Sequence, residues 1–278
     1  MIKAVQQFML GTVLNNRQQA QQTLQAIKQA GFNGMELCSF MIHPTPFAVK
    51  LLTKAAGMPV GNGGKLDWPA LIREAGLQVP AIHQYLDAVE KDADAAAAEC
   101  AAFDTDTLVI TGMYRFDYTD KQKVLELASR LNRAGSALQQ RGIRLLYHNH
   151  NTEFLPVEPG RSAYTLLQQE TDPALVNFEF DSYWCADAGC DPVWQMRQLG
   201  QRMKLWHATD RGCRKPGFTP ICKMDSMELG DGTMDLHALA AQARLSGCEA
   251  VILESHRNWL GGSPIASLRR SAQFLQQL

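Results

Sequence analysis

RLLYHNHNTEF, residues 144–154, joins an apolar run typical of a buried strand to a group of titratable side chains. Side chains alternate across a strand, so His148 and His150 share one face while Asn149 points to the other. Glu153 follows a few residues later. The rest of the chain indicates which fold places two imidazoles and a carboxylate at the end of such a strand.

Short apolar runs alternate with helix-length segments along the whole chain. Segments 17–31 and 120–135 carry apolar residues at helical spacing and end in glycine. Glycines stand shortly before several strands, where a helix C-cap is expected, at positions 31, 76, 142 and 247. Eight runs have the length and composition of buried parallel strands: QFMLGTVL (7–14), GMELCSF (34–40), LQVPAIHQY (77–85), TLVITGM (107–113), IRLLYHNH (143–150), LVNFEFD (175–181), MKLWHATD (203–210) and EAVILES (249–255).

Eight strand–helix units in 278 residues are the count of a (β/α)8 TIM barrel, so we predict an α/β fold with one barrel domain over residues 1–278. A doubly wound sheet is the alternative, but no glycine-rich phosphate motif follows the first strand. The connections 41–70 and 210–235 are long and rich in Pro and Gly. Loops of this length at strand ends are expected to form walls of an active site, and the first is expected to include a helix.

Composition narrows the class of protein. The formal net charge of −1, without a basic stripe, argues against nucleic acid as a partner. No run approaches the length of a membrane span, and the opening MIKAVQQFML is too interrupted for a secretory leader. The seven cysteines contain no C-x-x-C pair, so we expect reduced thiols in a cytoplasmic protein.

Titratable side chains collect at the carboxyl ends of the predicted strands, where barrel enzymes place their active sites. A single histidine there is more often bonded to backbone than to metal, but such groups on four successive strands favour a metal site. The four are His148, Asp181, His207 and Glu254. This mixed nitrogen and oxygen set suits one divalent ion, and we expect Mn²⁺, with Zn²⁺, Co²⁺ or Fe²⁺ as alternatives.

Several segments together resemble the sugar phosphate isomerase/epimerase superfamily of xylose-isomerase-like barrels: LYHNHNTEF (146–154), FEFDSYW (178–184), LWHATDRG (205–212), LGDGTMD (229–235) and ILES (252–255). Members of this superfamily hold one divalent metal with Glu, Asp, His and Glu from strands five to eight. The resemblance implies Asp181, His207 and Glu254 as the last three ligands. His148 stands at the first position, which is a departure and places a symmetrical two-glutamate mechanism in question.

The resemblance implies an isomerase or epimerase of a sugar, keto-sugar or cyclitol, acting on a small-molecule sugar or polyol. Such enzymes remove a proton next to a carbonyl through a metal-stabilised enediolate. We expect Glu254 to be both ligand and acid/base on one face of the substrate, with His150 or Glu153 on the other. A homo-oligomer is a further expectation.

Other side chains are expected to contact substrate, with a structural role open for each: His83, Glu36, Trp184 and Arg211. His83 is also a candidate acid/base, or a histidine bonded at the barrel rim. The structural role of Arg211 would be a surface salt bridge, and that of Glu153 a solvent-facing carboxylate. Glu179 is expected to face the helical layer, with a place behind the metal ligands as the alternative.

Three other functions remain open at this stage. A dehydratase or lyase acting on a keto-inositol or 3-keto-glycoside uses the same proton removal, and the absent glutamate favours it slightly. A DNA-repair endonuclease of the same fold would need more metal ligands and a basic face. A non-catalytic sugar-binding barrel is the last alternative.

Overall fold

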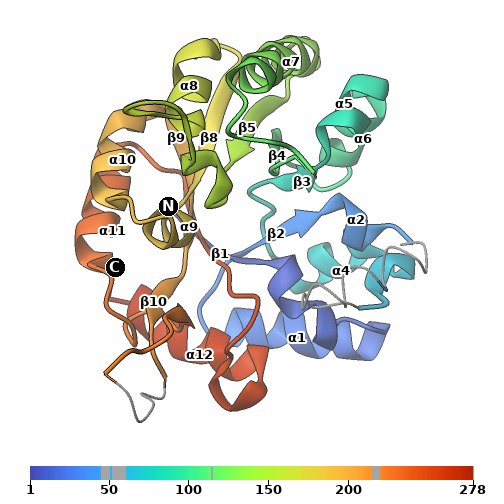
Figure 1. Ribbon diagram of the computed structural model, residues 1–278. Coiled ribbons are helices and arrows are strands. Elements are labelled where there is room, and N and C mark those ends of the chain that lie inside the picture. The colour runs from blue at the N-terminus through green and yellow to red at the C-terminus, as the bar shows by residue number, and fades with distance from the viewer. Residues whose placement is uncertain (45–50, 52–60, 114, 215–219, 278) are drawn as a thin grey trace. The chain divides into compact units, whose positions relative to one another are not determined.

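The computed structural model describes residues 1–44, 51, 61–113, 115–214 and 220–277 (Figure 1). Eight parallel strands close into a barrel in the order β1-β12-β9-β8-β5-β4-β3-β2. The barrel strands are β1 (Ile2–Gln6), β2 (Gly34–Cys38), β3 (Ile82–Gln84), β4 (Thr107–Ile110), β5 (Arg144–His148), β8 (Val176–Asp181), β9 (Met203–Ala208) and β12 (Ala250–Leu253). Helices alternate with these strands along the chain, which confirms the predicted (β/α)8 TIM-barrel class.

The chain divides into two compact units, and unit 1 comprises residues 1–80, 208–240 and 250–278. In this unit β1 pairs in parallel with both β12 and β2. Its other elements are η1 (Gln7–Val13), α1 (Arg17–Gln29), α2 (Ser39–Ile42), η2 (Gly63–Lys65), α4 (Trp68–Ala75), β10 (Asp210–Gly212), β11 (Asp225–Met227), η5 (Leu260–Gly262) and α12 (Pro264–Leu275).

Unit 2 comprises residues 81–207 and 241–249, and α11 (Leu236–Leu245) contributes to both units. Its parallel strands pair in the sequence β3, β4, β5, β8 and β9. The remaining elements are α5 (Leu86–Lys91), α6 (Ala93–Ala101), α7 (Lys121–Gln139), η3 (Thr152–Phe154), β6 (Pro156–Glu158), β7 (Arg161–Ser162), α8 (Ala163–Glu170), α9 (Ser182–Asp187), α10 (Pro192–Leu199) and η4 (Gly200–Arg202).

The core of unit 2 lies between its strands and the helices outside them. Every residue of β4 is buried, as expected for a parallel strand that is covered on both faces. Helix α7 packs against β5 and α8 (Figure 1). It buries an apolar face that includes Leu127 and Leu131. The same helix also contacts β8, so it supports both strands from which His148, Glu179 and Asp181 come.

The first strand was predicted in the wrong segment. QFMLGTVL was expected to be a strand, but residues 7–13 form the 3-10 helix η1, and the strand is the preceding IKAVQ. Ile2 to Val5 pair with Ala250 to Leu253 of β12. The side chain of Gln6 then accepts the N–H of Phe8 and starts the helical turn. Met9 and Leu10 are fully buried in that turn, which explains the apolar run.

The glycines expected at helix C-caps are confirmed, but the predicted segment 120–135 ends too early, because α7 continues to Gln139 and Gly135 is buried inside it. All four glycines named above have positive φ, and Gly76, at φ 61°, caps α4. In the predicted loop 41–70, residues 45–50 and 52–60 lie outside the described residues, and α4 begins at Trp68. The long connection 210–235 contains the antiparallel pair β10 and β11, while residues 215–219 are outside the description.

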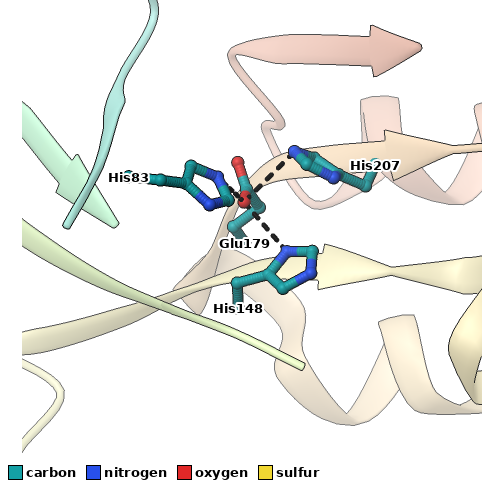
Figure 2. Close-up of side chains that lie close together, drawn as sticks. All are labelled: His83, His148, Glu179 and His207. Atoms are coloured by element: carbon teal, nitrogen blue, oxygen red, sulfur yellow. Dashed lines mark hydrogen bonds and ion pairs between the residues drawn. The ribbon is translucent and has the colours of Figure 1, made fainter. Parts of the chain in front are cut away.

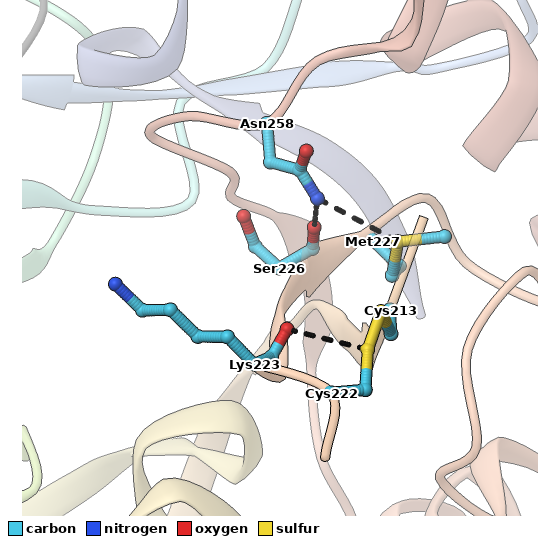
Figure 3. Close-up of a disulfide and its surroundings, with 6 residues drawn as sticks. All are labelled: Cys213, Cys222, Lys223, Ser226, Met227 and Asn258. Atoms are coloured by element: carbon cyan, nitrogen blue, oxygen red, sulfur yellow. Dashed lines mark hydrogen bonds between the residues drawn. A yellow bond between two sulfur atoms is a disulfide. The ribbon is translucent and has the colours of Figure 1, made fainter. Parts of the chain in front are cut away.

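The expectation that all cysteines are reduced is wrong for one pair. Cys213 and Cys222 form a disulfide in the β10–β11 connection, with Cα atoms 6.4 Å apart (Figure 3). Antiparallel pairing sets Gly212 opposite Asp225, which brings the two cysteines near one another. Near it, the Asn258 amide donates to the carbonyl of Ser226 in β11. Free thiols remain at Cys38, Cys100, Cys185, Cys190 and Cys248.

Within the described part of the chain, no helix has both the length and the apolar character needed to cross a membrane.

Candidate functional site

A buried carboxylate lies at the centre of a group of imidazoles in unit 2 (Figure 2). The Oε2 atom of Glu179 is close to one nitrogen of each of three rings: 2.8 Å from His83 Nε2, 3.0 Å from His148 Nδ1 and 3.2 Å from His207 Nε2. The rings also contact one another, and those of His148 and His207 have centroids 4.7 Å apart. All four side chains are buried.

Neighbouring strands bring these residues together. His148 of β5 is in register with Glu179 of β8, and Asp181 of β8 is in register with His207 of β9. Side chains two residues apart share one face of a strand, so Glu179 and Asp181 point the same way. The expectation that Glu179 faces the helical layer is therefore wrong, because its carboxylate is fully buried among the imidazoles.

Burial and hydrogen bonding set the charges of this group. Burial lowers the pKa of His148 to about 3, against the opposing effect of its contact with Glu179, so the ring is neutral near pH 7. For Glu179, burial favours the protonated acid, but the combined effect of His207, His83 and the hydrogen bonds keeps its pKa well below the ordinary value. The carboxylate is thus ionised and accepts hydrogen bonds.

Asp181 lies next to this group, and its two carboxylate oxygens have different partners. Its Oδ1 accepts the N–H of Trp184 at 2.8 Å and caps α9, while its Oδ2 lies 4.0 Å from His207 Nδ1. The amide of Asn149 holds the backbone of Asp181 by donating to its carbonyl at 3.1 Å and accepting its N–H at 3.0 Å. Asn149 therefore fixes the end of β8 against the end of β5.

Three of the four predicted metal ligands come together in unit 2. His148, Asp181 and His207 each offer a ligand atom within 4.8 Å of the others. Imidazole nitrogen and carboxylate oxygen in a buried setting are the donors that Zn²⁺, Mn²⁺, Co²⁺ and Fe²⁺ accept. In addition, Glu179 Oε1 is buried and has no hydrogen-bond partner among the described residues, as expected for a carboxylate beside a cation site. The residues present fit a divalent metal.

His150 lies beside this group, as predicted from its place on the same strand face. Its ring centroid is 5.0 Å from that of His148 and 6.0 Å from that of Trp184. Both His150 and Trp184 are partly exposed, whereas His148 is buried. Unit 2 thus places a partly exposed imidazole and an indole next to the buried ligands.

Glu153 is fully buried, so the alternative prediction of a solvent-facing carboxylate is wrong. Its Oε1 accepts the Tyr147 hydroxyl at 2.9 Å, and its Oε2 accepts the backbone N–H of His150 at 3.0 Å. The Tyr147 hydroxyl lies 2.8 Å from that of Tyr118, which also accepts the N–H of Met113. Burial and the nearby Glu153 raise the pKa values of both phenols, so both stay protonated.

The three other predicted site residues belong to unit 1. Glu36 of β2 is fully buried, and its Oε2 accepts the Gln6 amide at 2.5 Å. Glu254 follows β12 and lies 3.4 Å from His256 Nε2. Arg211 is partly buried in β10.

The sequence interpretation favoured the helical layer for Glu179 and kept a place behind the metal ligands only as the alternative, and it missed the pair Tyr118 and Tyr147. The two-residue spacing of Glu179 and Asp181 was a usable signal, since it places both side chains on one face. For the tyrosines there was none, because Tyr118 comes from a loop before α7 and only the tertiary fold brings it to Tyr147.

Comparison with known proteins gives three kinds of similarity. A family model described as a xylose isomerase-like TIM barrel matches residues 24–278. An inosose dehydratase of Mesomycoplasma hyopneumoniae (strain 7448) is 31% identical over 126 residues, which are 42% of this chain. The match spans only 39% of the length of that relative.

Two solved structures share the fold at low sequence identity. A sugar phosphate isomerase/epimerase from Parabacteroides distasonis ATCC 8503 has a TM-score of 0.78 at 22% identity, covering 99% of this chain and 93% of that one. The IOLI protein with a bound zinc atom has a TM-score of 0.70 at 11% identity, covering 100% of this chain and 97% of that one.

Proposed function

Because the chain belongs to the xylose isomerase-like TIM-barrel family, we propose that it is a divalent-metal-dependent isomerase or epimerase of a sugar, keto-sugar or cyclitol. The observation that carries this proposal is the convergence of His148, Asp181 and His207 in a buried setting beside an ionised carboxylate. The isomerase/epimerase from Parabacteroides distasonis with the same fold supports the reaction class.

His148, Asp181 and His207 would hold the metal, and we propose Glu254 as the fourth ligand on the basis of the sequence resemblance. A divalent ion bound there supplies a Lewis acid for the carbonyl and hydroxyl oxygens of a polyol. We propose Mn²⁺ as the native ion. The zinc in the IOLI structure supports a divalent metal in this fold and keeps Zn²⁺ as an alternative.

His150 is the better of the two predicted acid/base groups in unit 2. A general base needs a ring nitrogen or oxygen that the substrate can reach, and the imidazole of His150 is partly exposed. Both oxygens of Glu153 already accept hydrogen bonds in a buried setting. We therefore propose that His150 moves the proton at a ring nitrogen, that Glu153 holds the His150 backbone in place, and that Glu254 acts on the opposite substrate face.

The remaining predicted residues are proposed as substrate contacts. Trp184 lies beside His150 and offers an aromatic surface on which a sugar or cyclitol ring can stack. His83, Glu36 and Arg211 offer polar groups suited to hydroxyl or carbonyl oxygens.

Metal analysis of the purified protein tests the site. We expect about one transition metal ion per chain, and its loss in His207→Ala and in Asp181→Ala, because each variant removes a ligand. His237→Ala is the matched control, since His237 is an exposed histidine on α11. Full metal retention in both ligand variants would refute the proposed site.

A dehydratase or lyase is the second candidate, and two observations favour it. His148 replaces the first glutamate of the two-glutamate acid/base pair, and the partial relative is named an inosose dehydratase. Incubation with a panel of keto-sugars and keto-inositols in D₂O separates the two reactions. An epimerase incorporates deuterium at the inverted carbon without new ultraviolet absorption, whereas elimination produces an absorbing enone.

A further inference from the structure

Two sets of metal-ligating side chains overlap in unit 2. One contains His83, His148, Glu179 and His207, whose ligand atoms lie within 4.8 Å of one another. The other contains His148, Asp181 and His207. Since both sets use the same two imidazoles, the chemistry of those rings decides which set can take a cation.

A neutral imidazole has one N–H and one lone pair, on opposite sides of the ring. It can therefore donate to a carboxylate on one side and bind a metal on the other, but it cannot bind a metal on both sides. Glu179 approaches His148 at Nδ1 and His207 at Nε2. The other nitrogen of His207, Nδ1, is the one that lies 4.0 Å from Asp181 Oδ2.

We propose that Glu179 is a positioning residue that fixes the tautomers of His148 and His207, so that both rings keep their lone pairs for a single cation beside Asp181. The N–H groups are then at His148 Nδ1 and His207 Nε2, on the sides that face Glu179. The lone pairs are at His148 Nε2 and at His207 Nδ1, the nitrogen nearer to Asp181. The nitrogens of His148 and His207 that face Glu179 then carry protons, so they cannot bind a second metal there. The tautomers themselves exist in the metal-free protein. Only their consequence, the binding of a single cation, rests on the proposed metal function.

His83 strengthens this arrangement. Its Nε2 lies 2.8 Å from the same oxygen of Glu179, and its ring stacks on that of His207 with centroids 5.6 Å apart and planes at 24°. The His207 ring is thus held by a carboxylate at its edge and an imidazole on its face. Such outer contacts of metal-ligating histidines are known to affect metal affinity by about 10–100-fold.

The first test reads the tautomers directly in metal-free protein labelled with ¹⁵N-histidine, using long-range ¹H–¹⁵N correlation of the ring nitrogens. We expect His148 as the Nδ1–H form and His207 as the Nε2–H form, with His148→Gln and His207→Gln used to assign the signals. The opposite tautomer at either ring would overturn the proposal. This experiment needs no substitution of Glu179, so it holds even if variants at that position fail to fold.

The second test uses Glu179→Gln, which keeps the shape of the side chain but can turn an NH₂ group toward the rings. We expect mixed or reversed tautomers and a Kd for Zn²⁺ raised about 10–100-fold, with one ion per chain in the wild type. Glu228→Gln is the matched control, because this buried glutamate accepts from Arg214 and Ser267 rather than from imidazoles. An unchanged Kd in Glu179→Gln, or two ions per wild-type chain, would contradict the inference.

The two proposals fail in distinguishable ways. If the wild-type protein shows the expected tautomers but binds no metal, the proposed function is refuted while the proposed role of Glu179 is supported. Metal binding with the opposite tautomers would do the reverse.

Discussion

At the scale of single residues, the buried neutral ring of His148 makes the unfolding free energy depend on pH. Its pKa is about 3 in the folded chain and about 6.5 in an unfolded one, so only the unfolded chain takes up a proton between these values. The stabilisation is therefore fully present above pH 6.5 and is lost as the pH falls toward 3.

We expect metal-free protein to lose about 2 kcal/mol of unfolding free energy between pH 7 and pH 5 through this residue. Urea denaturation at the two pH values measures the loss. His148→Asn should lose less over the same interval, because asparagine offers Glu179 an N–H but does not titrate. Equal losses in the two proteins would show that another group is responsible.

Some of the site residues could be predicted from the sequence, and others could not. His148, Asp181 and His207 were predicted from strand ends together with the family resemblance, since a parallel barrel gathers the carboxyl ends of its strands. The tie between Glu153 and Tyr147 could not be predicted, because strand parity does not reach into the turn that follows β5. The same limit applies to the contact of Tyr118 with Tyr147.

At the scale of elements, one carboxylate of β10 holds the segment that follows β11. Asp210 accepts the N–H groups of Gly230, Gly232 and Met234 at 3.1, 2.9 and 3.1 Å. A Cβ atom on Gly232 would collide with this carboxylate, which explains a glycine at that position of LGDGTMD. Asp210 is buried, so these charge-assisted bonds are shielded from water.

Asp210→Ala should lower the unfolding free energy by about 3 kcal/mol, because it leaves several inward N–H groups without an acceptor. Asp225→Ala on the paired strand is the control. It removes an ion pair with Arg257, whose side chain is 58% exposed, and should cost less than about 1 kcal/mol. Chemical denaturation compares the variants, and equal losses would mean that Asp210 does not organise the segment after β11.

Strands that are buried on both faces were predicted from their apolar runs, as in TLVI of β4 and AVIL of β12. The first strand could not be predicted in this way. IKAVQ is short and carries Lys3, while the following QFML is more apolar but buries its side chains in a 3-10 turn. The pairing of Ile2 to Val5 with β12, rather than local hydrophobicity, determines the strand.

At the scale of the whole molecule, the oxidation state of the cysteines can be measured by counting reactive thiols. The sequence carries seven cysteines, and two of them form the Cys213–Cys222 disulfide. Their spacing gave no signal, because the bond depends on the β10–β11 hairpin and not on a known motif.

Protein purified without reductant and denatured in guanidinium should therefore react with a thiol reagent at five positions per chain, not seven. Reduction before denaturation should restore the full number. Replacing both cysteines with serine should lower the unfolding free energy by about 2–3 kcal/mol, since the bond closes a loop with a sequence separation of 9. Seven reactive thiols in the untreated protein would contradict the disulfide.

The carboxylate of Glu179 would also determine how the protein acquires the metal ion that we propose. Many small metalloproteins fold only when the metal is bound, because their ligand side chains are not held in place without it. Here the three imidazoles are already tied to an anion inside a packed unit. A chelator should strip such a protein without unfolding it, and a different divalent ion could then be taken up, so the metal found in a cell would reflect local supply as much as selection by the site.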